Sequence, residues 1–257
     1  MQIGIGKVDV IIPAKDRHNI RLGLAKVLAA APWVNNIIVG TSTPLATARI
    51  AGAKRCTTEW VAMFDDDVEI PGDWFEKVSA EITDGDGVVA VSSPDMSAIP
   101  DYYCMQLLTD RLIGLKGRDT PFIDNVLFKK SALEGYAPPL AFYCEDEFFY
   151  NHIKKKGRWL HTGPIGVVHY YREKDAIYGG ASQRIYKFEP AYIILRRTLV
   201  RFILPIFAAL FYTHTPKTIY RFWRINVRII AGWIMGETLK EKVGLSWEWD
   251  GRRDANK

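Results

Sequence analysis

The sequence has little cysteine and no long hydrophobic run. Its three cysteines are far apart and lack Cys-x-x-Cys spacing, which excludes a disulfide framework and a cysteine-bound zinc site. No charge-free apolar run reaches about 18 residues, and the mean hydropathy is −0.06, so the chain is not a polytopic transporter. It also starts directly on the apolar run Val8–Ile12, without the regions of a secretory signal, so we expect its catalytic part on the cytoplasmic side.

The composition is that of a folded protein with unevenly distributed charge. The length of 257 residues predicts one large domain plus an appendage, and a composition of 48% hydrophobic and 25% charged residues excludes a disordered or collagen-like chain. Residues 172–257 carry twice as many Lys and Arg as Asp and Glu, whereas residues 1–171 are slightly acidic. We therefore expect no nucleic-acid binding by the larger part, and the basic C-terminal third needs a separate explanation.

Hydrophobic periodicity alternates between that of strands and that of helices. It predicts strands at 8–12, 36–40, 60–64 and 88–91, and helices at 20–31, 45–56 and 71–82. A further helix is expected at 145–156 and a short strand at 167–170, whereas 95–143 is less regular. The alternation predicts an α/β fold with a mostly parallel, doubly wound sheet flanked by helices. Such sheets bind ligands beyond the carboxyl ends of their strands.

Three consecutive acids follow the third predicted strand. The two-residue period of a strand aims Asp65 and Asp67 the same way and Asp66 the opposite way. Two carboxylates on one face repel each other unless a cation neutralises them, and hard oxygen ligands suit Mg²⁺ or Mn²⁺. A metal held this way completes its coordination with substrate phosphates and water. The alternative is an acidic loop that caps the next helix.

Four ordered segments resemble family 2 glycosyltransferases with the GT-A fold. They are Val8–Pro13, Ala48–Ala53, Met63–Asp67 and Cys144–Asp146. The resemblance covers about residues 7–172 and implies a Rossmann-like GT-A catalytic domain at 1–172. It also implies a nucleotide diphosphate sugar as donor and Mn²⁺ or Mg²⁺ as cofactor.

The resemblance implies roles for individual residues. Asp67 would be the main metal ligand, Asp65 would share the metal and lie nearer the ribose, and Arg49 would face the diphosphate. The implied nucleotide-binding set is Pro13, Ala14, Lys15, Asp16, Arg17, Arg49, Asp65 and Asp66. The acid that usually reads the base after the second strand is missing from 40–43, which leaves the identity of the base open.

A second acidic run, Glu145-Asp146-Glu147, opens a helix that closes with three lysines. This order of charge is also the one that the helix dipole favours, which is an alternative explanation. By resemblance, Asp146 would be the general base of an inverting transfer, and Glu145 would lie on the acceptor side. If the acceptor is a phosphate monoester, already ionised at neutral pH, Asp146 would only orient it.

His169 ends the predicted strand at 167–170. Many GT-A enzymes supply a third metal ligand at this place, so the resemblance implies that His169 joins Asp65 and Asp67. A lone histidine with a structural role is the alternative.

The C-terminal third combines arginines with aromatic and apolar residues. Residues 173–189 are interpreted as a lid or linker, in which Arg184 or Lys187 could receive an acceptor phosphate. Residues 190–257 are interpreted as a helical hairpin, membrane-embedded or interfacial, followed by a basic tail. Its arms would be 199–212 and 229–236. A buried hairpin of a soluble domain is the alternative.

These observations predict a metal-dependent, membrane-associated glycosyltransferase. The resemblance extends to dolichyl-phosphate mannosyltransferases and to small cellulose-synthase-like enzymes. It implies transfer of mannose from GDP-mannose, with inversion, to a dolichyl or polyprenyl phosphate or to a lipid-linked glycan. Two alternatives remain open: a soluble transferase of the same fold with a small polar acceptor, and a non-catalytic membrane-tethered protein that binds nucleotide sugars.

Overall fold

The structure is a computed structural model that forms two compact units. The first comprises Met1–Met96, Thr120–Tyr170 and Ser246–Lys257, and the second Ser97–Asp119 and Tyr171–Leu245. The residues that the structure describes are 5–14, 16–42, 45–83, 85–94, 96–97, 123–137, 145–170, 176–177, 180–181, 192, 195, 199–200, 202–203, 216–236 and 238–239.

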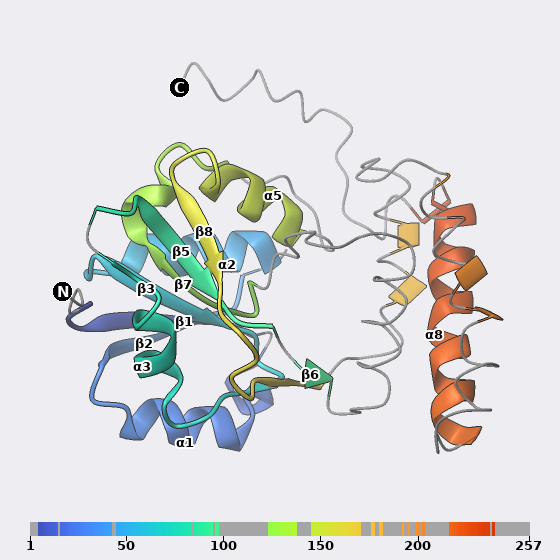
Figure 1. Ribbon diagram of the computed structural model, residues 1–257, viewed down its shortest axis with the longest axis horizontal. Helices are drawn as coiled ribbons and strands as arrows, with labels where there is room; N and C mark the ends of the chain where they lie inside the picture. Colours follow the sequence, from blue (N-terminus) through green and yellow to red (C-terminus); the bar gives the residue numbers. More distant parts are fainter. Residues whose placement is uncertain are drawn as a thin grey trace. The chain divides into compact units, whose positions relative to one another are not determined.

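The first unit is built on a six-stranded sheet with the order β2-β1-β3-β7-β5-β8 (Figure 1). Its strands are β1 (Val8–Pro13), β2 (Val34–Gly40), β3 (Trp60–Phe64), β5 (Val88–Ser92), β7 (Asn125–Lys129) and β8 (Arg158–His161). The pairs β1–β2, β1–β3 and β5–β8 are parallel. Strand β7 is antiparallel to both of its neighbours, β3 and β5.

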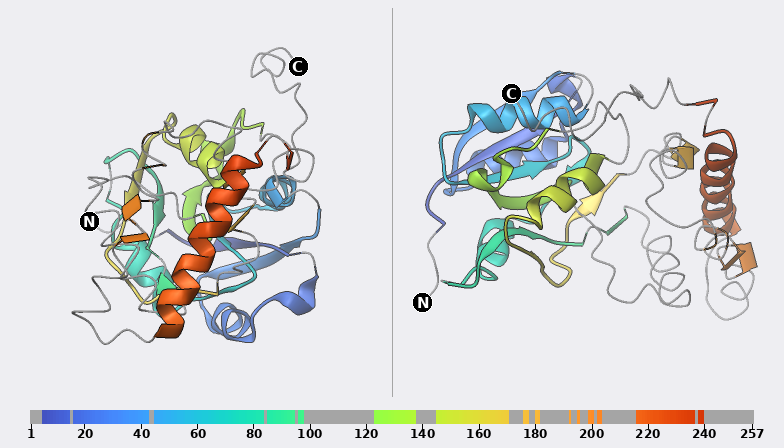
Figure 2. Two further views of the ribbon diagram at one scale, coloured as in Figure 1. Left: turned by 90° about the vertical axis from the view of Figure 1, so that its right-hand side faces the viewer. Right: turned by 90° about the horizontal axis from the view of Figure 1, so that it is seen from above.

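Helices cover both faces of this sheet, which confirms the mixed α/β fold with a mostly parallel central sheet (Figures 1 and 2). They are α1 (Leu22–Ala30), α2 (Leu45–Arg55), α3 (Trp74–Ser79) and α5 (Glu145–Ile153), with the 3-10 helices η1 (Arg17–Asn19) and η2 (Lys130–Leu133). Leu24 of α1 and Trp74 of α3 share one core with Val10, whereas Phe149 of α5 shares the other core with Ile11. Successive residues of β1 thus point to opposite cores, as strand geometry requires.

A second, small sheet has the order β4-β9-β6. Its strands are β4 (Val68–Glu69), β6 (Met96–Ser97) and β9 (Val168–His169). Strand β4 runs antiparallel to β9, with Val68 opposite His169. This register places His169 next to the acids that precede β4.

The amino ends of β1, β2 and β3 are held together by one buried carboxylate, that of Asp9. It is fully buried and accepts hydrogen bonds from the backbone N–H of Thr57 and Thr58 and from the side-chain amides of Asn35 and Asn36. Burial raises the pKa of Asp9, but these hydrogen bonds outweigh it and lower the pKa to about 2. Asp9 is therefore a structural anion.

The sequence-based expectations and the structure differ at four strands. The alternation predicted β1, β2, β3, β5 and β9 but not β4, β6, β7 or β8. Strand β7 begins with the polar residue Asn125 and has an apolar run of only three residues, 126–128, so its periodicity is too short to be distinctive. Its pairing with β3 is a long-range contact, which local patterns do not report.

In the second unit the structure describes one long helix, α8 (Pro216–Ile234), which contains part of the predicted second hairpin arm (Figure 2). Gly232 of α8 lies so close to the chain at 177 that a Cβ there would meet the carbonyl oxygen of Ile177. Among the described residues, no helix combines the length and the apolar character needed to cross a membrane. Most of the predicted first arm, 199–212, lies outside the described residues.

Candidate active site

The acids after β3 lie in a loop that is fixed by backbone hydrogen bonds on three sides. Asp65 donates its N–H to the carbonyl of Asp124 at 3.1 Å, and the carbonyl of Asp67 accepts from the N–H of Tyr170 at 2.9 Å. The carbonyl of Asp66 accepts from the N–H of Arg21 at 3.0 Å. The loop is therefore held by the segments before α1, before β7 and after β9.

This loop brings Asp65 and Asp67 together with His169. One ligand atom from each of the three side chains lies within 4.8 Å of the other two, and Nε2 of His169 is 3.2 Å from Oδ1 of Asp67. Two carboxylate oxygens and one imidazole nitrogen fit Mn²⁺ well and also suit Mg²⁺. The three side chains are 21%, 19% and 22% exposed, so a ligand's phosphates can reach an ion held there.

A cluster of three side chains fixes β4 against β9 beside these ligands. Nε of Arg21 is 2.8 Å from Oε1 of Glu69, and the hydroxyl of Tyr170 donates to the other oxygen of Glu69 at 3.1 Å. The guanidinium of Arg21 also stacks on the Tyr170 ring, 3.5 Å from its centroid. The hydrogen bond from Arg21 lowers the pKa of Glu69. This cluster, which the sequence did not reveal, supports the position of His169.

Arg49 connects the two acidic runs. It is only 3% exposed, and its Nη2 lies 2.7 Å from Oδ1 of Asp65 and 3.3 Å from Oε1 of Glu145. Burial lowers the pKa of Arg49, and the two carboxylates outweigh it and raise the pKa overall. Arg49 thus neutralises part of the acidic charge. Its predicted contact with the diphosphate stays a prediction.

The helix that carries Arg49 lies close to the sheet because small residues face β1. A Cβ on Gly52 would lie 2.7 Å from Cγ2 of Ile11, so a larger residue there would push α2 away from the sheet. The segment Ala48–Ala53 therefore contributes in two ways. Its small residues permit the close approach, and Arg49 uses that approach to reach Asp65.

Asp146 lies in the first turn of α5, next to Glu145. Burial raises the pKa of Glu145, and Arg49 offsets only part of this effect. Asp146 remains partly exposed, and burial together with repulsion from Glu145 and Glu147 raises its pKa to about 7. A carboxylate with a pKa near neutrality is suited to accept a proton from an acceptor hydroxyl.

The predicted floor of the nucleotide pocket is described only in part. The N–H of Ala14, just after Pro13, donates to the carbonyl of Gly40 at 2.9 Å, and Oδ1 of Asp16 accepts from the N–H of His18 at 3.0 Å. Arg17 begins η1, but its side chain is outside the described residues. Lys15, Arg184 and Lys187 also lie outside them, so their roles stay predictions.

Asp124 is a site residue that the sequence did not reveal. It immediately precedes β7, and because β7 is antiparallel to β3, the start of β7 lies at the edge where β3 ends. The register pairs Phe64 with Asn125, so Asp124 lies beside Asp65. An acid before a short apolar run was the only available signal, and it is informative only once the strand direction is known.

The profile of the family described as "Glycosyl transferase family 2" matches residues 10–131, which include β1, Arg49, the Asp65–Asp67 loop and β7. The protein is therefore a glycosyltransferase, an enzyme that moves a sugar from a donor to an acceptor. None of the curated proteins that were compared matches the sequence.

Solved structures that are similar to this chain include two kinds of transferase. The mannosyltransferase PcManGT from Pyrobaculum calidifontis, in complex with GDP-Man and Mn²⁺, is 14% identical with a TM-score of 0.57, covering 92% of this chain and 88% of that chain. Glucosyl-3-phosphoglycerate synthase from Mycobacterium tuberculosis, in complex with Mn²⁺, UDP and phosphoglyceric acid, is 13% identical with a TM-score of 0.47, covering 75% and 78%. The first likeness confirms the predicted GT-A-like fold.

Proposed function

We propose that the protein transfers mannose from GDP-mannose, with inversion, to a lipid-linked acceptor in glycan or glycolipid synthesis. The observation that carries this proposal is the group formed by Asp65, Asp67 and His169, which Arg49 connects to the acidic start of α5. Asp65, Asp67 and His169 suit a divalent ion that binds a diphosphate. Asp146, at the start of α5, offers a base.

A bound Mn²⁺ or Mg²⁺ would supply positive charge where the departing diphosphate becomes more negative. Asp65, Asp67 and His169 would hold the ion, and the buried Arg49 limits the repulsion between Asp65 and Glu145. Asp146 takes the proton of an acceptor hydroxyl, or orients an acceptor phosphate that is already ionised.

The donor is proposed from the comparison with PcManGT, whose structure contains GDP-Man and Mn²⁺. This enzyme matches 92% of the chain. A panel of radiolabelled nucleotide sugars, with a polyprenyl phosphate as acceptor and with or without EDTA, tests this choice of donor. We expect GDP-mannose to give the fastest transfer and EDTA to abolish it.

Three outcomes of this panel have different consequences. Faster transfer from UDP-glucose would disprove the choice of donor and keep the reaction class. Transfer only to small polar acceptors would support the soluble alternative. Donor binding without transfer to any acceptor would support a non-catalytic binding protein.

The lipid acceptor and the membrane association are proposed from α8. Its exposed side carries large apolar residues, with Tyr220 63%, Val227 51% and Ile234 71% exposed, whereas Phe222 and Ile225 are buried on the other side. Exposed Arg224 adds positive charge to the apolar side. An apolar face mixed with arginines is typical of a helix that lies in the interface of an anionic membrane.

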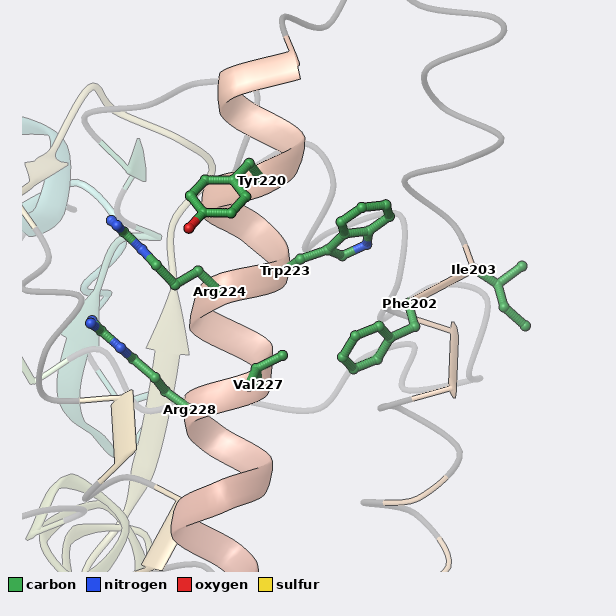
Figure 3. Close-up of a pocket in the computed structure, with 7 residues that line it drawn as sticks. All are labelled: Phe202, Ile203, Tyr220, Trp223, Arg224, Val227 and Arg228. Carbon is green, nitrogen blue, oxygen red and sulfur yellow. The ribbon is translucent and has the colours of Figure 1, made fainter.

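A pocket of about 740 Å³ lies on the same side of α8. It is lined by Phe202, Ile203, Tyr220, Trp223, Arg224, Val227 and Arg228. Figure 3 shows Arg224 and Arg228 extending from one side of the helix and Trp223 from the other, toward Phe202. Apolar walls with cationic side chains at the margin match the chemistry of a prenyl phosphate.

Vesicle flotation tests the membrane proposal without requiring turnover. We expect the full chain to float with vesicles that contain an anionic phospholipid and to stay unbound with neutral vesicles. The double variant Val227→Asp with Arg224→Glu should abolish flotation. Lys26→Glu on α1 reverses one exposed charge elsewhere and should have no effect. Equal flotation of the double variant would disprove the role of α8.

A further inference from the structure

The imidazole of His169 has a carboxylate on each side. Its Nε2 is 3.2 Å from Oδ1 of Asp67, and its Nδ1 is 3.6 Å from Oδ2 of Asp124. The second distance is within ion-pair range and longer than a hydrogen bond. A histidine binds one metal ion through one nitrogen, so with Nε2 directed at Asp67 the Asp124 carboxylate lies behind the ring.

Asp124 is itself held in place from the sheet. It is 8% exposed, and its Oδ1 accepts from Nδ2 of Asn125 at 3.4 Å. The Asn125 amide is fixed in turn, because its Oδ1 accepts from the N–H of Ser93 at 3.1 Å and from the Ser93 hydroxyl at 2.7 Å. A polar connection therefore runs from Ser93, just after β5, through Asn125 of β7 and Asp124 to His169.

We propose that Asp124 is a positioning residue for the metal site, holding His169 as the Nδ1–H tautomer so that Nε2 is the nitrogen that binds the ion. A carboxylate behind a metal-binding imidazole fixes the ring orientation and makes the other nitrogen a better ligand. The backbone carbonyl of Asp124 also accepts from Asp65, so one residue holds two of the three ligands. This inference rests on the proposed metal-dependent function.

Manganese affinity, measured by calorimetry on the full chain without donor, is the first test. We expect Asp124→Ala to weaken Mn²⁺ binding by about 10- to 100-fold, the usual effect of losing such a partner. Asp124→Asn, which keeps the shape and the contact with Asn125, should weaken binding less. Asp86→Asn removes an exposed carboxylate of the same unit and serves as the charge control, with unchanged affinity expected.

A double-mutant cycle separates positioning from simple loss of negative charge. In a His169→Ala background, Asp124→Ala should have little further effect on Mn²⁺ affinity, because its target is gone. An equal loss in both backgrounds would overturn the proposal. Failure of the wild type to bind Mn²⁺ would instead contradict the proposed metal-dependent function.

The tautomer of the ion-loaded protein provides a readout besides affinity. In protein with ¹⁵N-labelled histidine and saturating Mg²⁺, where Nε2 would bind the ion, we expect His169 to show a protonated Nδ1. His169→Gln assigns the signals. Asp124→Ala should shift the population toward the Nε2–H form, and an unchanged His169 spectrum would contradict the proposal. Circular dichroism of each variant checks that it is folded.

Discussion

Aspartates stand at both ends of the central strands, and their surroundings are opposite. At the amino ends, Asp9 is fully buried and accepts hydrogen bonds from donors in two segments, β2 and the residues before β3. At the carboxyl ends, Asp65 and Asp67 are about one-fifth exposed, and other carboxylates lie near them. The first arrangement satisfies a carboxylate and stabilises the fold. The second leaves negative charge that a cation can neutralise, which is how a ligand site is built.

The largest loss of activity is expected for a substitution of Asp67. Asp67→Ala should lower metal-dependent transfer by about 1,000-fold, because charge stabilisation at the leaving group is lost. The melting temperature in EDTA should be unchanged or slightly raised, because a source of repulsion is removed. Initial rates measure the transfer, and scanning calorimetry measures the melting temperature. A large loss of stability in EDTA would show that Asp67 is structural, like Asp9.

Asp9 should show the reverse behaviour. Asp9→Ala should lower the free energy of unfolding by about 3 kcal/mol, because buried N–H groups lose their acceptor. Manganese affinity of the folded variant should stay unchanged. Urea denaturation measures stability, with Asp86→Ala as an exposed control. A stability equal to that of the wild type would contradict the structural role of Asp9.

The pH dependence of turnover tests whether Asp146 acts as a general base. With a hydroxyl acceptor, Asp146→Asn should lower turnover by about 100-fold. Because its pKa is raised to about 7, wild-type turnover should fall as pH decreases below that value and the base becomes protonated. The variant should lose this acid limb. With a phosphate monoester acceptor both effects should be small, so the two acceptor classes are distinguished in one experiment.

The two ends should also differ in the sign of their pH-dependent stability. The folded pKa of Asp9 is about 2, below the ordinary 3.8, so its contribution is present above pH 3.8 and is lost as pH falls toward 2. This contribution is about 2 kcal/mol. The raised pKa of Asp146 acts in the opposite direction, since ionisation costs stability as pH rises from 3.8 to about 7.

Unfolding curves measured from about pH 2 to above pH 7 therefore sharpen the comparison. Asp9→Asn should lower the free energy of unfolding above pH 3.8, where the wild-type carboxylate is ionised in both states, and have less effect as the pH falls toward 2. Asp146→Asn should add stability above pH 7, where the wild-type carboxylate is charged and crowded by its neighbours. If both variants shifted stability in the same direction at neutral pH, the contrast between the two ends would be wrong.

Much of the fold and part of the site followed from the sequence alone. The periodicity of 8–12, 36–40 and 60–64 is local, so it predicted three parallel strands and the edge where ligands bind. Asp65 and Asp67 were identifiable because a strand end and a two-residue period suffice to place them on one face. His169 was identifiable through its short strand and the family resemblance, and the structure brings it to Asp67.

Only the tertiary structure decided how these residues are supported. Arg49 and Glu145 are 96 positions apart, and their contact depends on α2 and α5 packing on the same sheet face. Asp124 joins the site because β7 runs antiparallel between β3 and β5, which brings the beginning of one strand to the end of another. Periodicity reports which face a residue occupies, but strand order and direction arise from long-range pairing, and these decide which charges meet.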